Sequence, residues 1–190
     1  MWGRVKMEGG GVESQDWEGR MSVTAREWWG VIHGMGLGAL FLVAFAGGLA
    51  GLYSLKPGLI TPEGIGERMR RLKIGVVVMA AAAWGTVLTG TWIVYPWYRE
   101  EIPSSAKTRL LADAATADWH EFGMEWKEHI AWISPILATV VAYIVVYYGT
   151  NLIRHERVRK TAITLFVMAF AFAAVAGGLG AFITKVAPVR

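Results

Sequence analysis

The feature that most limits the possible folds of this chain is a set of four long apolar runs, separated by segments that carry most of the charge. The first run, from Trp28 to Leu55, contains no charged side chain. A helix of about 20 apolar residues crosses a bilayer core of about 30 Å. Hydrophobic residues make up 54% of the chain and charged residues only 18%, and a soluble domain does not gather its apolar residues in such runs. The sequence therefore predicts an all-α, four-helix transmembrane bundle.

The predicted spans cover about 28–55, 74–97, 129–149 and 161–184. They alternate in direction, which gives an up-down bundle, and residues 27–190 are predicted to form a single membrane domain. Residues 1–26 are predicted to be a flexible polar tail, within which Met21 is a candidate native start. In the connection between the second and third spans, Leu111, Ala115, Phe122 and Trp126 recur near helical spacing, which predicts an amphipathic surface helix.

The charges between the spans predict the orientation of the chain in the membrane. Two short connections are basic, with Arg68, Arg70, Arg71 and Lys73 in one and Arg154, Arg157, Arg159 and Lys160 in the other. The connection between the second and third spans is acidic. Basic loops stay on the cytoplasmic side, so both termini and the acidic loop are expected outside it. A bacterial inner membrane is the expected location.

Composition excludes several classes of function. The chain has no cysteine, so iron–sulfur clusters, covalently attached c-type haem, thiolate metal sites and disulfides are excluded. The net charge of +4 is explained by topology, and no nucleic-acid partner is expected. The four predicted spans contain no Asp, Glu, Lys or Arg, which argues against a proton pump or an ion-coupled transporter.

Two histidines stand out because each lies near the same end of a predicted span. His33 is surrounded by small residues that include Gly34 and Gly38, and His129 begins the third span. An ionisable group inside a span is costly and is first interpreted as functional. Two imidazoles from facing helices can ligate haem iron from both sides, and glycines one turn apart would let the macrocycle approach the backbone. The first hypothesis is therefore a b-type haem between His33 and His129.

With these four spans and two histidines, the chain resembles the four-helix membrane-anchor b-type cytochromes. The resemblance covers the spans and the placement of His33 and His129, and it includes no diagnostic motif. It implies an electron-transfer subunit of a larger membrane complex that exchanges electrons between quinol and a redox partner.

Two other hypotheses remain open at this stage. An outer-face copper or iron site would use ligand types that are dense in 120–129, with His120, Met124 and Glu125 as reserve ligands. A non-catalytic subunit that stabilises a larger membrane complex would use small-residue faces, such as those around Gly47 and Gly177, for close helix packing. Neither hypothesis, nor the haem, makes the chain a stand-alone enzyme.

Overall fold

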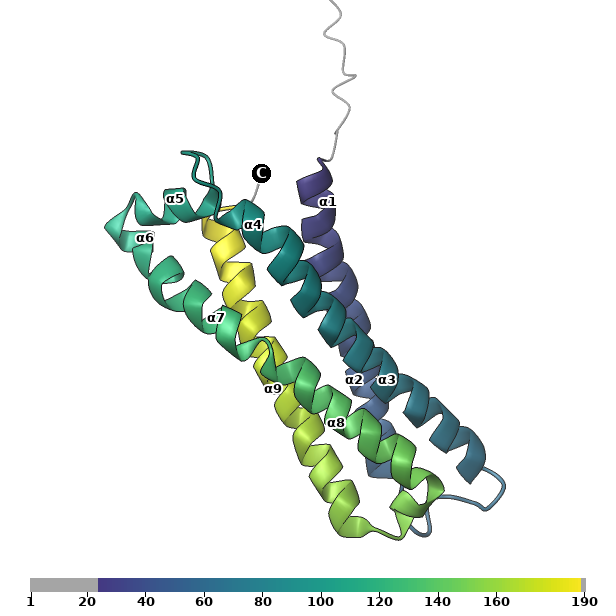
Figure 1. The fold of residues 1–190 in the computed structure, drawn as a ribbon. Coiled ribbons are helices and arrows are strands. Elements are labelled where there is room, and N and C mark those ends of the chain that lie inside the picture. The colour runs from purple at the N-terminus through teal and green to yellow at the C-terminus, as the bar shows by residue number, and fades with distance from the viewer. Residues whose placement is uncertain (1–23, 189–190) are drawn as a thin grey trace, which may run out of the picture.

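A computed structural model describes residues 24–188 as a bundle of four long helices, without a strand in that range. The helices are long and apolar enough to cross a membrane, and they run over Ala25–Ser54, Ile65–Tyr98, Ala114–Ile153 and Glu156–Val186. Neighbouring helices run in opposite directions, so Thr24 and Pro188 lie at the same end of the bundle (Figure 1). We call this end the terminal end and the opposite end, which holds the two short loops, the basic end. The predicted four-helix bundle is confirmed, and the predicted tail lies mostly outside the described residues.

Within these four helices the structure distinguishes shorter elements. The first comprises α1 (Ala25–Val31), η1 (Ile32–Gly36) and α2 (Leu37–Ser54), and the second comprises α3 (Ile65–Thr89), η2 (Gly90–Val94) and α4 (Tyr95–Tyr98). The third comprises α6 (Ala114–Asp118), η3 (Trp119–Met124), α7 (Glu125–Ile130), α8 (Ile133–Tyr148) and η4 (Gly149–Ile153). The fourth is the uninterrupted α9 (Glu156–Val186).

Local sequence explains where the first helix begins and ends. Thr24 caps its start, since the Thr24 hydroxyl accepts a bond from the Glu27 backbone N–H at 3.2 Å and the Glu27 carboxylate accepts one from the Thr24 N–H at 2.8 Å. The helix stops at Ser54, just before Pro57, which cannot donate a backbone hydrogen bond. Gly58 follows with φ at +87°, a conformation that favours glycine.

The helices extend beyond the predicted spans, most of all at the terminal end of the third. That helix begins at Ala114, whereas the predicted span begins at 129, because hydropathy reports only where apolar side chains start. The separate amphipathic surface helix is not confirmed. The connection holds the short α5 (Ala106–Leu111), and the residues after Asp113 belong to the third helix itself. Lys127 and Glu128 consequently lie inside the third long helix, although the predicted span excludes them.

Pro135 explains an interruption in the third helix. The α-helix is broken at Ala131 and Trp132, because proline has no N–H for the carbonyl one turn before it. The break separates the terminal half of this helix, which carries polar residues, from the apolar α8.

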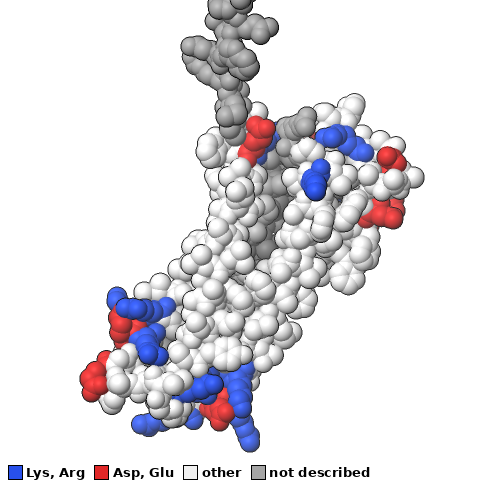
Figure 2. Space-filling view, turned by 180° about the vertical axis from the view of Figure 1, so that it is seen from behind, with Lys and Arg blue, Asp and Glu red and all other residues white. Residues whose placement is uncertain are grey.

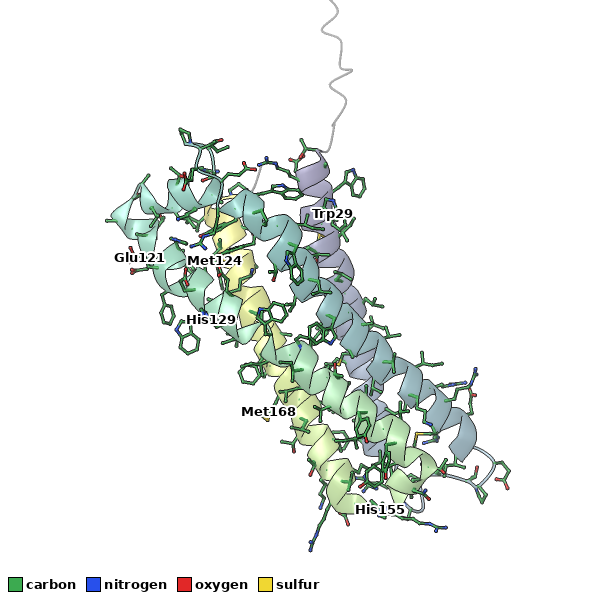
Figure 3. The ribbon with its side chains drawn as sticks, viewed as in Figure 1. Trp29, Glu121, Met124, His129, His155 and Met168 are labelled. Carbon is green, nitrogen blue, oxygen red and sulfur yellow. The ribbon has the colours of Figure 1, made fainter. Side chains whose placement is uncertain are left out.

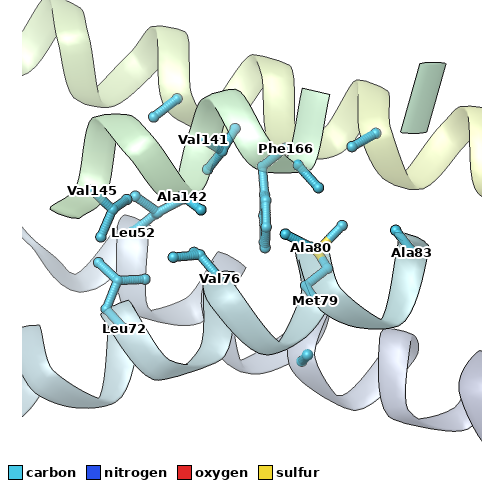
Figure 4. Packing of buried hydrophobic residues seen from close by; sticks show 14 of the residues in the cluster. Leu52, Leu72, Val76, Met79, Ala80, Ala83, Val141, Ala142, Val145 and Phe166 are labelled. Carbon is cyan, nitrogen blue, oxygen red and sulfur yellow. The ribbon is translucent and has the colours of Figure 1, made fainter. Parts of the chain in front are cut away.

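The main core lies toward the basic end, where all four helices pack together (Figure 4). Phe166 of α9 is fully buried at its centre and occupies the space beside Gly48, where a Cβ would lie 2.7 Å from the Phe166 Cζ atom. Arg159 closes the basic end. Its buried guanidinium donates to the Leu55 carbonyl and, at 3.4 Å, to the Ile153 carbonyl.

Charged side chains gather at the two ends of the molecule, with an uncharged band between them (Figure 2). Lysines and arginines are concentrated at the basic end. This distribution fits a multi-pass membrane protein.

Candidate functional site

His33 lies in η1 and faces the second helix. Its Nδ1 atom is 3.0 Å from the Thr89 hydroxyl oxygen. The Thr89 hydroxyl itself donates to the Gly85 carbonyl at 2.7 Å. Since that hydroxyl proton is already used, Thr89 accepts the bond from His33, so Nδ1 carries the proton and Nε2 is left as an acceptor.

Gly90 provides the space in which the His33 ring lies. A Cβ atom on Gly90 would be 2.8 Å from the His33 Cε1 atom and 3.5 Å from Nε2. Real Cβ atoms do not approach other atoms this closely, so only glycine lets the imidazole lie against the second helix. Thr89 and Gly90 together fix both the orientation and the position of the ring.

Lys127 and Glu128 bring two further ionisable groups to the same region from the third helix. The stem of Lys127 passes over Gly180 of α9, where a Cβ would lie 2.9 Å from the Lys127 Cε atom. The Lys127 ammonium interacts electrostatically with His33 and with Glu128. The Glu128 Oε1 atom is buried and has no hydrogen-bond partner among residues 24–188.

Two tyrosines and a second histidine extend this group toward the terminal end. Glu128 interacts with Tyr95 and with Tyr98, and the Tyr98 hydroxyl lies 2.9 Å from the Nδ1 atom of His120. Tyr98 and His120 are both buried, with exposed fractions of 1% and 8%. We call the connected set the polar cluster: His33, Thr89, Tyr95, Tyr98, His120, Lys127 and Glu128.

Three of the four helices change from α to π geometry where they meet this cluster. His33 lies in η1, Thr89 directly precedes η2, and His120 lies in η3, and all three segments have π geometry. Single π turns are rare within α-helices, but those that occur are often located at functional sites, because the wider turn redirects side chains. The π segments of the described residues thus lie at the polar cluster, whereas α2, α3, α8 and α9, which supply most of the main core, are regular α-helices.

The length of helix that a bilayer core requires ends close to this cluster. About 20 residues of helix cross the apolar core of a bilayer, and counting that length back from Tyr148 at the basic end reaches Glu128. Figure 1 shows the helices around this level spread further apart than they are at the basic end.

His129 points in a different direction from its neighbours Lys127 and Glu128. It is exposed, and its Nδ1 atom is 2.6 Å from the backbone carbonyl of Glu125, so it donates within its own helix. Figure 3 shows α7, with His129, on the opposite side of the molecule from Trp29 on the first helix. Among residues 24–188 no hydrogen bond, ring contact or electrostatic interaction joins His33 to His129.

The other residues predicted for a cofactor or metal are distributed as follows. Gly34 and Gly38 face open space, since a Cβ on either would meet no atom within 4 Å. Met124 is buried and packs with Leu110 and Ile183, His120 bonds to Tyr98, and Glu125 lines a surface groove. Within the described residues, no group of three or more His, Asp or Glu side chains is arranged to hold a metal ion.

A haem ligated by both predicted histidines does not fit this arrangement. Each ring donates from Nδ1, which leaves Nε2 as the acceptor that a ligand would require, but His33 lies between the first and second helices while His129 lies on an exposed face. The structure does not bring the two imidazoles together, so bis-histidine ligation stays a prediction from the sequence that this geometry does not support.

Most of the polar cluster was missed from sequence because the third span was started at His129. The signal was present in the pair Lys127 and Glu128, which directly follows Trp126, a residue type common at membrane interfaces. Extending the predicted span by one turn would have placed both charges within it, at the same end of the bundle as His33. The contributions of Thr89, Tyr95 and Tyr98 depend on packing and carry no local signal.

No protein-family model, curated protein or solved structure matches the chain. Its class therefore follows from its fold and composition: four apolar helices of this kind fit a multi-pass helical membrane protein. The polar cluster is the feature that a proposal about its function must explain.

Proposed function

We propose that the protein is an integral membrane subunit of an electron-transfer assembly and that its polar cluster binds the headgroup of a quinol. The observation that carries this proposal is the buried, unpartnered Glu128 Oε1 atom beside an ammonium, two phenols and an imidazole. Burying these groups is costly, and a purely structural bundle gains nothing from it. A ligand with its own hydroxyl groups would satisfy the unpaired oxygen.

The chemistry of a quinol matches the groups in the cluster. A quinol donates from two hydroxyls. The Glu128 Oε1 atom has no hydrogen-bond partner among residues 24–188, and Nε2 is the acceptor atom of the His33 ring, whose Nδ1 bonds to Thr89. A quinone accepts at two carbonyls, and Lys127 and Tyr95 are donors. Oxidation of the quinol gives up two electrons to a redox centre of a partner subunit. The two protons pass to Glu128 and His33, so atoms and charge balance.

The position of the cluster suits such a ligand. A quinol is carried in the bilayer by its apolar tail, and the cluster lies where the apolar core ends. Under the positive-inside rule the terminal end faces away from the cytoplasm, so we propose that protons leave on that side. Both termini and the acidic connection would then be extracytoplasmic, in a bacterial inner membrane.

Quinone binding to the purified protein in lipid nanodiscs tests the proposal. Quenching of tryptophan fluorescence should report saturable binding of a short-tailed benzoquinone or naphthoquinone analogue. Glu128→Gln and Lys127→Met keep the size of each side chain, and each should weaken binding at least tenfold. Glu101→Gln, in the acidic connection, is the matched control and should leave binding unchanged. Absence of saturable binding by both analogues would overturn the proposal.

The b-type haem predicted from the sequence is tested on the same preparation. A reduced-minus-oxidised spectrum would show a haem band, and His33→Ala and His129→Ala would each remove it if both residues were ligands. Loss in His33→Ala alone would instead indicate a haem with a different second ligand. Copper or iron without haem would appear in metal analysis of the colourless protein.

A structural role in a larger complex is the second candidate, favoured by one observation on α9. A Cβ on Gly177 or Gly178 would meet no atom within 4 Å, so this small-residue surface is not covered by the described chain. Small surfaces allow close helix contact, and a partner helix could pack there. Gly177→Leu would then release co-purifying subunits without changing quinone binding.

A further inference from the structure

Tyr98 and His120 form a buried pair that no step of the proposed quinol chemistry uses. The Tyr98 hydroxyl oxygen lies 2.9 Å from the His120 Nδ1 atom, and the two ring centroids are 5.8 Å apart. Both residues are buried. The donors and acceptors that match a quinol headgroup come from other members of the polar cluster: His33, Tyr95, Lys127 and Glu128. The pair therefore needs an explanation of its own.

The pair connects Glu128 with charged residues at the terminal end. Glu128 interacts electrostatically with both Tyr98 and His120. Tyr95, which also interacts with Glu128, stacks on the Tyr98 ring with centroids 6.2 Å apart. Four charged groups act on His120: Arg99, Lys107, Glu125 and Glu128. Two of them, Arg99 and Lys107, line a pocket on the surface, so the pair extends from the carboxyl that would receive a quinol proton toward water.

Both side chains can take up one proton while they release another. A phenol hydroxyl donates and accepts, and an imidazole carries a proton on either ring nitrogen. A proton passes between two such groups when their heavy atoms are within hydrogen-bond distance, which the 2.9 Å between the Tyr98 oxygen and the His120 Nδ1 atom provides. Two apolar side chains would fill this space without the cost of burying polar atoms. The exchangeable protons of the pair are thus its distinctive property.

We propose that Tyr98 and His120 conduct the proton of Glu128 to the terminal surface. Tyr98 takes up the proton that Glu128 releases and gives its own hydroxyl proton to the Nδ1 atom of His120. His120 then releases its Nε2 proton to water, and exchange with water restores its first tautomer. One proton enters and one leaves at each residue, so both recover their charge and no electron moves. The path rests on the proposed quinol site, because quinol oxidation is the source of the proton on Glu128.

Infrared spectroscopy after a light-induced pH jump tests this path in lipid nanodiscs without any quinone. Protonation of Glu128 gives a carboxyl C=O band, which Glu128→Gln removes. Tyr98→Phe and His120→Ala should each slow the appearance of this band at least tenfold. The double variant should be no slower than the slower single one, because the two groups act in series. Unchanged rates in both single variants would overturn the proposal, as would a carboxyl that stays ionised at every pH at which the protein is folded.

Chemical rescue separates proton conduction from a loss of structure. Imidazole should restore the rate in His120→Ala, whereas pyrazole, which has the same shape but takes up a proton only in strong acid, should not. Failure of imidazole, or equal rescue by both compounds, would contradict a conducting role for His120.

Leu110→Val is the matched control for packing. Leu110 is fully buried and packs in the same cluster as Tyr98, so this change loosens the terminal end without removing an exchangeable proton. It should leave the rate unchanged, and a slowing equal to that of Tyr98→Phe would show that packing, not proton transfer, sets the rate. Quinone binding to the unaltered protein is measured separately, so a failed proton path and an absent quinol site give different results.

Discussion

The imidazole of His33 on the first helix occupies the space that a side chain at Gly90 on the second helix would take. A Cβ there would lie 2.8 Å from the His33 Cε1 atom, while the Thr89 hydroxyl, one residue earlier, accepts the bond from Nδ1 at 3.0 Å. Two consecutive residues of one helix therefore set the position and the tautomer of a histidine on another. Lys127 of the third helix interacts electrostatically with the ring held in this way.

Gly90→Ala is expected to displace the His33 ring and break its bond to Thr89. Overpacking of this kind costs about 1–3 kcal/mol, offset in part by the better helix propensity of alanine. Quinone affinity should fall at least as far as in Thr89→Val, because both changes release the ring. Gly34→Ala and Gly38→Ala, where a Cβ meets no atom within 4 Å, serve as controls. An unchanged ¹⁵N shift of the His33 Nδ1 atom in Gly90→Ala would contradict the assigned contact.

Tyr98→Phe should destabilise the terminal end without altering the main core. The Tyr98 hydroxyl is 2.9 Å from the Nδ1 atom of His120, and removing one member of a buried pair costs about 1–3 kcal/mol. His120→Phe should cost a similar amount, and the double variant should cost less than the sum of the two. Unfolding in mixed micelles measures all three free energies. Additive costs would show that the two side chains are not coupled.

The sequence predicted the bundle because hydropathy and loop charge are local properties. The apolar run from Trp28 to Leu55 needs nothing else to be recognised as a span. The site was harder to predict, since it depends on which way each side chain faces. His129 and Glu128 are adjacent in sequence, but one is exposed and the other is turned inward. Hydropathy also placed the start of the third span at His129, directly after the charged pair Lys127 and Glu128. The predicted span thereby excluded the two residues that are most informative about the site.

The glycines show the same limit of prediction from sequence. Gly34, Gly38, Gly48 and Gly90 look alike in sequence, yet only at the last two would an added Cβ lie within 3 Å of a neighbouring side chain. The neighbours are Phe166 and His33, both far away along the chain. No pattern within one helix can show which of its glycines faces a bulky residue of another helix.

Gly48→Ala should lower the stability of the core by about 1–3 kcal/mol more than Gly47→Ala does. Both substitutions gain the same helix propensity, so their difference isolates the contact. A Cβ at position 48 would lie 2.7 Å from the Phe166 Cζ atom, whereas one at position 47 meets no atom within 4 Å. Phe166 is fully buried and cannot move aside without overpacking its neighbours. Equal stabilities of the two variants would show that the first and fourth helices do not pack as described.

Arg26 and Glu100 should be coupled across the terminal ends of the first two helices. Their side chains form a bidentate pair with nitrogen–oxygen distances of 2.9 and 2.7 Å, and Arg26 also lies 5.6 Å from the Trp97 ring centroid. Each side chain is about one-third exposed, so solvent screens the pair. A double-mutant cycle with alanine should give a coupling near the upper end of about 0.2–1 kcal/mol, reduced at 1 M salt. A coupling that salt does not change would indicate packing, not charge, as its source.

Arg159→Leu should be the most damaging single change at the basic end. The guanidinium is buried and donates to the Leu55 and Ile153 carbonyls, which end the first helix and the 3₁₀ segment η4. Leucine fills similar space but leaves both carbonyls unpaired, at a cost of about 1–3 kcal/mol for each buried acceptor. Arg157→Leu, on the exposed side of the same helix, removes the same charge and should cost much less. Arg159→Lys keeps a donor and should recover part of the loss in unfolding free energy. If Arg157→Leu and Arg159→Leu are equally stable, the loss reflects net charge, and Arg159 does not connect the two carbonyls.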